Sequence, residues 1–190
     1  NKAYTSTLDS HGVEIVHERA TVSGPNEVTL ASGRTISAGK ILIAVGARPA
    51  IPHCPGSEHG ITSNEVFHLD ALPKRVLIAG AGYIANEFAG IFNEFGSKVT
   101  LINRTDVILR GYDEQIRDRL LQISMTKGID FRFHAEFREI EKQADGSLKV
   151  SMTDHEDLEV DCVLFATGRV PNTEDLGLAE AGVELDAKGA

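Results

Sequence analysis

The stretch RVLIAGAGYIANEFAGIFNEFGSKVTLINR, residues 75–104, decides the fold. Residues 75–79 form an apolar run of strand length, and the glycine-rich segment 80–85 follows it at once. Apolar residues between 84 and 95 then recur with a period of roughly 3.6, which predicts a helix that ends at the following glycine. Residues 99–102 are predicted to form the next strand. A strand, glycine turn, helix and strand within about 30 residues is the context that a dinucleotide-binding G-x-G-x-x-G/A motif requires.

The small residues of the turn each have a predicted physical role. Gly80 permits the tight turn out of the strand, and Gly82 lets backbone N–H groups approach a pyrophosphate closely. Ala85 takes the place of a third glycine and still allows close contact between helix and strand. The diphosphate of a dinucleotide is expected at the helix N-terminus, where unpaired N–H groups and the helix dipole favour an anion. The alternative is a parallel α/β core whose crevice binds nothing.

The end of the second strand predicts which dinucleotide binds. An NAD site normally carries Asp or Glu here, and its carboxylate accepts from the ribose 2′-hydroxyl. This chain has Asn103 at that position, followed by Arg104 and then Arg110. A carboxylate would repel a 2′-phosphate, whereas guanidinium groups pair with phosphate through charge-assisted hydrogen bonds. NADPH is therefore the predicted cofactor. In the alternative interpretation both arginines are solvated surface charges, and Asn103 itself leaves room for NADH.

Net charge and hydropathy exclude two function classes. The chain has 190 residues and a net charge of −9, which argues against nonspecific nucleic-acid binding because that needs a basic surface. Against this background Arg104, Arg110, Arg117 and Arg119 form a local basic patch suited to a small phosphate ligand. No apolar run approaches the ~18 residues of a membrane span, and we expect no membrane partner. The chain begins at Asn1, so we expect a piece of a longer protein.

The two cysteines point to a cytoplasmic protein without a redox pair of its own. Cys54 and Cys162 lie far apart in the sequence, with no C-x-x-C spacing. Cys162 lies in an apolar strand and is predicted to be an inert core thiol. His53, Cys54 and His59 lie near one another in the sequence but lack a fourth ligand, so we predict no metal site.

The rest of the chain is predicted to be rich in short strands. Residues 40–46 are a continuous apolar run suited to a strand buried on both faces. Asp113 is predicted to cap a second helix that has Ile116, Leu120 and Ile123 on one face. Ser63 is predicted to cap a short helix in the connector before residue 75. The remaining predicted strands are 13–17, 20–22, 27–30, 35–37, 129–133, a meander over 137–160, and 163–166.

A weak internal repeat organises these strands. The first part of the chain contains a predicted strand, a meander and an apolar strand that ends in Gly46. The last part repeats this order, and its apolar strand ends in Gly168. We interpret this as two dinucleotide-type domains that each use a meander as the crossover. The predicted fold class is α/β, a Rossmann-like three-layer domain with an antiparallel β-meander crossover plus an incomplete first domain.

Several motifs together resemble a known family. They are GAGYIANEFAGIFNEFG (80–96), LINR (101–104), ILRGYD (108–113) and FATGRVPNTEDLGL (165–178). The chain is similar to the pyridine-nucleotide domain of flavoprotein disulfide reductases, and within that family it most resembles the glutathione reductases. The resemblance runs through nearly all of the chain. It implies an NADPH domain at 71–165, the C-terminal part of an FAD domain at 1–70, and a return segment at 166–190.

The resemblance also implies roles for single residues. Tyr83 would close over the flavin until NADPH displaces it, and Ala81 and Ile84 would contribute backbone contacts and wall. Glu87 would contact the amide region of the nicotinamide. Gly168 would give NADPH a backbone contact, and Ala20 and Gly46 would occupy the corresponding places for FAD.

The implied parent enzyme is a homodimer that passes hydride from NADPH to FAD and electrons to glutathione disulfide. Its redox cysteine pair and its catalytic His–Glu pair have no match in this chain, so no catalytic residue is expected here and the chain alone is not expected to reduce disulfides. Trypanothione reductases, dihydrolipoamide dehydrogenases and other NADP-linked flavoproteins such as peroxide or metal-ion reductases stay open as alternatives. So does a free-standing nucleotide-binding module.

Overall fold

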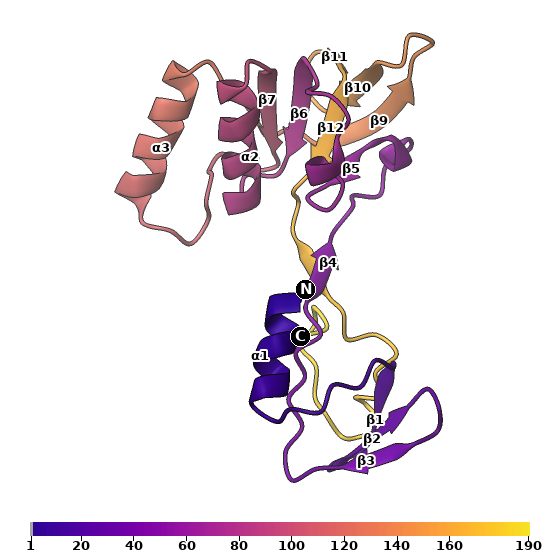
Figure 1. Ribbon diagram of the computed structural model, residues 1–190. Helices are drawn as coiled ribbons and strands as arrows, with labels where there is room; N and C mark the ends of the chain where they lie inside the picture. Colours follow the sequence, from indigo (N-terminus) through magenta and orange to yellow (C-terminus); the bar gives the residue numbers. More distant parts are fainter. Residues whose placement is uncertain (1) are drawn as a thin grey trace. The chain divides into compact units, whose positions relative to one another are not determined.

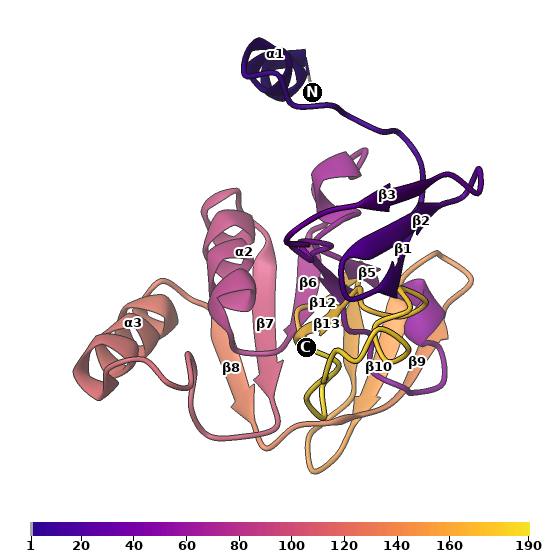
Figure 2. The same cartoon turned by 90° about the horizontal axis from the view of Figure 1, so that it is seen from below.

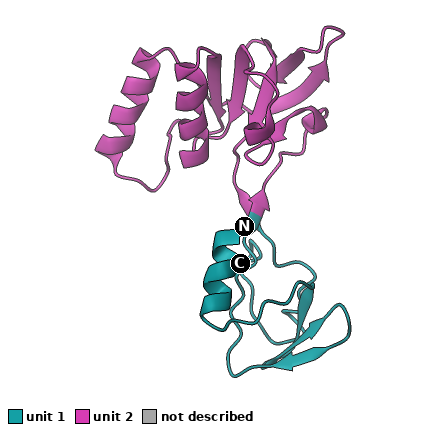
Figure 3. Ribbon diagram, viewed as in Figure 1, with its two compact units in different colours: residues 1–47, 171–190 teal, residues 48–170 magenta. Residues whose placement is uncertain are grey.

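The computed structural model describes residues 2–190, which divide into two compact units (Figure 3). Unit 2 is Arg48–Val170, and unit 1 comprises the residues up to Ala47 together with Pro171–Ala190. The chain passes between the units in two strands, β4 (Ala47–Pro49) and β13 (Arg169–Pro171), which form a two-stranded sheet.

Unit 2 is built on a five-stranded parallel sheet of order β5-β12-β6-β7-β8 (Figures 1 and 2). Its strands are β5 (Ile61–Thr62), β6 (Arg75–Ala79), β7 (Lys98–Asn103), β8 (Asp130–Phe133) and β12 (Cys162–Phe165). The helices are α2 (Tyr83–Glu94) and α3 (Glu114–Thr126), with single 3-10 turns η1 (Ser57–His59) and η2 (Val66–His68) before β6. The antiparallel meander β9 (Phe137–Lys142), β10 (Leu148–Met152) and β11 (Leu158–Val160) connects β8 to β12.

Two apolar cores cover the two faces of this sheet. Val76 and Ile78 of β6 pack with the apolar face of α2, which buries Ala85, Ala89 and Phe92. The alternate strand residues Leu77 and Ala79 pack instead with the buried side chains of the meander. Strand residues alternate between faces, so a parallel sheet buried on both sides needs such a cover on each. Helix, sheet and meander make three layers, and the predicted α/β class with a meander crossover is confirmed.

The predicted cap of α3 is confirmed, whereas only Leu120 of its predicted apolar face packs against the core. The Asp113 carboxylate accepts a hydrogen bond from the Ile116 N–H at 3.1 Å. Ile116 and Ile123 are exposed, and the half-buried Leu121, which was not predicted, packs against the core together with Leu120. The connector helix is the 3-10 turn η2, whose N-cap residue is Glu65 rather than the predicted Ser63, without a side-chain cap. The Glu65 carboxylate instead accepts hydrogen bonds from the backbone N–H and the hydroxyl of Thr62.

Unit 1 contains the helix α1 (Lys2–Ser10) and the antiparallel meander β1 (Ala20–Gly24), β2 (Glu27–Leu30) and β3 (Thr35–Ser37). The helix α1 was not predicted, and it buries no residue. The predicted strands 13–17 and 40–46 are wrong, because both segments are irregular. Leu42 is 89% exposed. A strand buried on both faces needs neighbours that bond to its edges, and no strand in residues 2–190 pairs with either segment.

Candidate functional site

The glycine-rich segment 80–85, here called the glycine loop, lies at the carboxyl ends of β6 and β12, where the strand order of the sheet reverses. Gly80 has a φ of 108°, and a Cβ at this position would lie 2.3 Å from the carbonyl oxygen of Ala166. Both its backbone conformation and the neighbouring strand therefore require glycine here. In open α/β sheets the crevice at such a reversal is where ligands bind.

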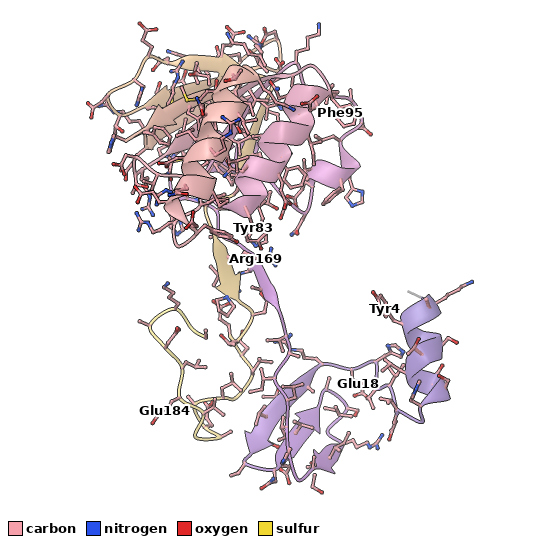
Figure 4. The ribbon with its side chains drawn as sticks, turned by 90° about the vertical axis from the view of Figure 1, so that its left-hand side faces the viewer. Tyr4, Glu18, Tyr83, Phe95, Arg169 and Glu184 are labelled. Carbon is pink, nitrogen blue, oxygen red and sulfur yellow. The ribbon has the colours of Figure 1, made fainter. Side chains whose placement is uncertain are left out.

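The N-terminus of α2 faces open space. Gly82 is the N-cap residue, it provides no side-chain cap, and a Cβ built on it would meet no atom within 4 Å. Tyr83, the first residue of the helix, is 55% exposed. Figure 4 shows Tyr83 at this end of α2 and Phe95 at the other. The first-turn N–H groups have no partner within the helix, so they and the helix dipole can bind an anion here.

Asn86 fixes the glycine loop, a role that sequence reasoning missed. Its side-chain Nδ2 donates to the carbonyl oxygens of Ala81 at 3.0 Å and Gly82 at 2.9 Å. The Leu109 N–H also donates to the Ala81 carbonyl, at 2.8 Å. The carbonyl dipoles of the loop are thereby engaged by protein donors, which favours an orientation in which N–H groups face the ligand. A polar residue in the fourth helical position, beside an apolar face, is the signal that could have indicated this role.

Two clefts meet at the glycine loop. The first has a volume of about 460 Å³ and is walled by the ends of β6 and β7, Thr167 after β12, residues 135–137 after β8, and the segment 50–54. The second has a volume of about 300 Å³ and is lined by Gly82, Tyr83, Arg110 and Tyr112 among others. Ala81, Asn103 and Arg104 line both clefts. Sequence reasoning missed segments 50–54 and 135–137, because only the folded sheet brings them to its edge.

The predicted basic patch separates into two pairs of arginines. Arg104 and Arg110 are exposed on the second cleft, and neither guanidinium group forms an ion pair within residues 2–190. Arg117 instead lies 3.6 Å from both Glu114 and Asp118, and Arg119 donates to the Gln122 side chain at 2.9 Å. Only the first pair can meet an anion in the cleft without losing a protein partner.

The other predicted site residues of unit 2 differ in burial and in their contacts. Ala85 is fully buried against the sheet, Ile84 is half-buried, and Glu87 is exposed on α2. Gly168 follows β12 with a φ of 133°, and its carbonyl oxygen accepts from the Ala50 N–H at 2.9 Å. Its neighbour Thr167 lines the first cleft.

Ala20 and Gly46 belong to unit 1. Ala20 is the first residue of β1 and pairs with Leu30 of β2. The carbonyl oxygen of Gly46, which has a φ of 70°, accepts from the Asn172 N–H at 3.0 Å.

Neither cysteine is activated. Cys162 is 6% exposed, as predicted for a core thiol, and burial raises its pKa to about 11. Burial, with a further contribution from Glu58, also raises the pKa of Cys54, which lines the first cleft. A thiol with a raised pKa is a poor nucleophile because it seldom forms the thiolate.

Two further features are absent from the part of the chain that the structure describes. No three His, Cys, Asp or Glu side chains between residues 2 and 190 gather as they would around a metal ion. No helix in that range has the length and apolar character that crossing a membrane requires.

Curated relatives match nearly all of this chain. It is 44% identical over 187 residues to a glutathione reductase from Burkholderia cepacia and 45% identical over 187 residues to one from Nostoc sp. (strain PCC 7120). A trypanothione reductase from Trypanosoma congolense is 39% identical over 202 residues. These matches cover 98%, 97% and 100% of this chain but only 41%, 40% and 41% of the relatives. The chain therefore spans about two fifths of the length of these relatives.

A solved structure shows the same fold at full coverage. The HOCl-induced flavoprotein disulfide reductase RclA from Escherichia coli is 30% identical, with a TM-score of 0.88. The likeness covers 100% of this chain and 44% of that one. All 190 residues also match the family described as pyridine nucleotide-disulphide oxidoreductase. The predicted resemblance is thus confirmed, and the chain belongs to the pyridine nucleotide-disulphide oxidoreductase family.

Proposed function

We propose that this chain is the NADPH-binding portion of a flavoenzyme of the glutathione reductase type. The observation that carries the proposal is the pair Arg104 and Arg110, which line a cleft beside an uncapped helix N-terminus and form no ion pair with described residues. A helix N-terminus suits a diphosphate, and two guanidinium groups nearby suit a further phosphate. NADPH differs from NADH by that further phosphate.

The residues present fit a dinucleotide. The N–H groups that follow Gly82 would hold the diphosphate, with Ala81, Ile84 and Ala85 as wall and helix contact. Arg104 and Arg110 would hold the 2′-phosphate. Glycine at position 82 leaves the space in front of these N–H groups free, since a Cβ there would project into open space.

The nicotinamide half would lie towards the residues after β12. Gly168 would offer it a backbone contact, Glu87 would bind its amide group, and Tyr83 would cover the reacting face until the cofactor displaces it. The side chain of Tyr83 is largely exposed, which leaves space for such a movement. Bound NADPH would supply a hydride for FAD.

The wider enzyme is part of the same proposal. Residues 1–70 would be the C-terminal part of an FAD domain, with Ala20 and Gly46 against FAD, residues 71–165 the NADPH domain and residues 166–190 the return segment. The parent would be a homodimer that reduces glutathione disulfide with a cysteine pair and a His–Glu pair from other segments. A cytoplasmic setting agrees with the two free thiols, Cys54 and Cys162.

Reduction of trypanothione disulfide is the second candidate. The 39% identity to the Trypanosoma congolense enzyme favours it over more distant alternatives. Both candidates use the same NADPH site, so the experiment below tests what they share.

The test is a calorimetric titration of the chain with NADPH and with NADH at two salt concentrations. We expect NADPH to bind at least about tenfold more tightly, a difference of ~1.4 kcal/mol, and its binding to weaken with salt. Arg104→Ala and Arg110→Ala should each lower NADPH affinity about tenfold and leave NADH affinity unchanged, because each removes a charge-assisted contact. Arg119→Ala is the matched control and should change neither. Equal affinities of the unaltered chain for both cofactors would refute the proposal.

A further inference from the structure

Asn103 occupies the strand-end position of β7 but directs its donors into its own loop. Its Nδ2 lies 2.9 Å from Thr105 Oγ1, 2.9 Å from the Val107 carbonyl oxygen and 3.2 Å from the Thr105 carbonyl oxygen. A side-chain amide has only two N–H hydrogens, so these acceptors use its whole donor capacity. No side-chain N–H of Asn103 is left to donate to a ribose or phosphate oxygen.

The loop that Asn103 holds carries both arginines of the second cleft. Arg104 and Arg110 flank a segment whose far end is anchored by Ile108, which is fully buried, and Leu109, which is 9% exposed. Leu109 has a φ of 46°, a left-handed conformation that a leucine adopts only when its surroundings require it.

The same loop is attached to the phosphate-binding side of the site. The Leu109 N–H donates to the Ala81 carbonyl at 2.8 Å, and Asn86 Nδ2 donates to that carbonyl at 3.0 Å. The segment 104–110, which carries both arginines, is therefore fixed at one end by Asn103 and at the other by the glycine loop. The spacing between the diphosphate position and the two guanidinium groups depends on both attachments.

From these contacts we infer that Asn103 is a specificity-determining positioning residue, which selects NADPH by shaping the loop that presents Arg104 and Arg110. This inference rests on the proposed function. Asn103 itself touches neither ribose nor phosphate; it acts through the two arginines.

The chemistry of the acceptors explains why an acid cannot replace Asn103. Thr105 and Val107 present carbonyl oxygens to this side chain. A carboxylate is acceptor-only when ionised, so it would face these oxygens without a hydrogen bond between them. The strand-end acid of an NAD site and this loop conformation therefore exclude each other.

The test uses two substitutions with different charge in the full 190-residue chain. Asn103→Leu removes the donors without adding charge, and we expect the ratio of NADPH to NADH affinity to fall about fivefold or more while NADH affinity stays constant. Asn103→Asp should lower NADPH affinity further and should not raise NADH affinity. Asn103→Ser keeps one hydroxyl donor in a small side chain, so it should give an intermediate ratio, and it provides the test if the leucine variant does not fold.

Asn93→Asp is the matched control. Asn93 Nδ2 also donates to a carbonyl oxygen, that of Lys127 at 3.1 Å, but at the far end of α2. This variant loses the same kind of bond and gains the same charge, and its affinity ratio should equal that of the unaltered chain. A thermal melt of each variant separates loss of folding from loss of selectivity.

The outcomes distinguish this inference from the proposed function. If the unaltered chain shows no NADPH preference, both are overturned. If it prefers NADPH and the folded Asn103→Leu and Asn103→Ser variants keep the full preference, only the inference fails. A gain of NADH affinity in Asn103→Asp would mean that position 103 faces the ribose directly, and it would also overturn the inference.

Discussion

Two apolar runs of this chain have the same local pattern and different structures. Residues 41–45 and the strand β12 each follow a three-stranded antiparallel meander, and a glycine comes at or shortly after the end of each. β12 is buried along its whole length, with Leu164 fully inaccessible. Residues 41–45 are irregular, and Leu42 is 89% exposed.

The difference lies in the neighbours. β12 has a parallel partner on each edge, β5 and β6, and an apolar layer on each face. Among the described residues no strand bonds to segment 41–45. A segment without strand partners cannot bury its backbone N–H and C=O groups without cost, and residues 41–45 accordingly include no fully buried side chain. The strand propensity of an apolar run is therefore realised only where partners satisfy its edges.

Truncating one leucine in each run should give the largest contrast. Leu164→Ala leaves a cavity in a core that cannot collapse around it, and we expect it to lower the free energy of unfolding by about 2–5 kcal/mol. Leu42→Ala removes only exposed surface and should change that free energy by less than about 0.5 kcal/mol. Urea unfolding followed by far-ultraviolet circular dichroism measures both. A large cost for Leu42→Ala would show that segment 41–45 is buried in solution.

Two glycines, Gly80 after β6 and Gly46 after residues 41–45, should differ almost as much. Gly80→Ala places a methyl group against the Ala166 carbonyl at a φ of 108°, and the combined overlap and backbone strain should cost about 2–4 kcal/mol. Gly46→Ala has a φ of 70° with no atom within 4 Å of the new Cβ, so only the left-handed backbone cost of about 1 kcal/mol is expected.

Thermal unfolding measures the stability of both glycine variants, and NADPH binding provides a second measurement that reports on the site. Because Gly80 lies in the glycine loop, Gly80→Ala should also abolish NADPH binding in whatever fraction stays folded, whereas Gly46→Ala should not affect it. Equal shifts in melting temperature for the two variants would mean that the carbonyl of Ala166 moves away easily and that close packing does not select glycine at position 80.

The same contrast explains which parts of the fold the sequence predicts. In unit 2 the consecutive elements β6, α2 and β7 are also neighbours in space. The two strands pair with each other, and the helix packs on both. Their periodicity therefore predicts them well, as does the cap at Asp113. The strand prediction at 40–46 was wrong because an apolar run does not itself show whether another strand pairs with it, and no described strand pairs with this one. The helix α1 was missed since it has no buried face to create a periodic pattern.

The features of the candidate site likewise divide into those that the sequence predicts and those that it does not. The glycine loop and the two arginines follow from spacing along the chain and were predicted as site residues. The amide contacts of Asn103 could not be predicted, because they depend on which way the carbonyl groups of Thr105 and Val107 turn. Backbone carbonyl direction in an irregular loop is a product of the whole fold and leaves no pattern in the side chains.

The smallest expected effect concerns an ionic contact at the amino end of the β6–β12 pair. Asp161, just before β12, accepts from the Arg75 backbone N–H at 2.8 Å and from Arg75 Nη2 at 2.6 Å. Arg75 Nη1 also donates to Glu159 at 2.8 Å. The Arg75 side-chain hydrogen bond is the main cause that lowers the pKa of Asp161 in the folded chain, and the backbone N–H also contributes.

This contact should make stability depend on pH in a defined direction. Because the folded pKa of Asp161 lies below the unfolded value of about 3.9, its contribution is complete above that value and is lost as pH falls through the folded pKa. Asp161→Asn should therefore cost about 0.5–1 kcal/mol at pH 7, the range of a partly exposed ion pair, and progressively less below about pH 4. Urea unfolding midpoints at pH 7 and below about pH 4 measure this cost, and Asp70→Asn, at an exposed position, is the control. A cost that is the same at low pH would mean that the carboxylate charge of Asp161 does not stabilise the start of β12, and that its neutral hydrogen bonds to the backbone suffice.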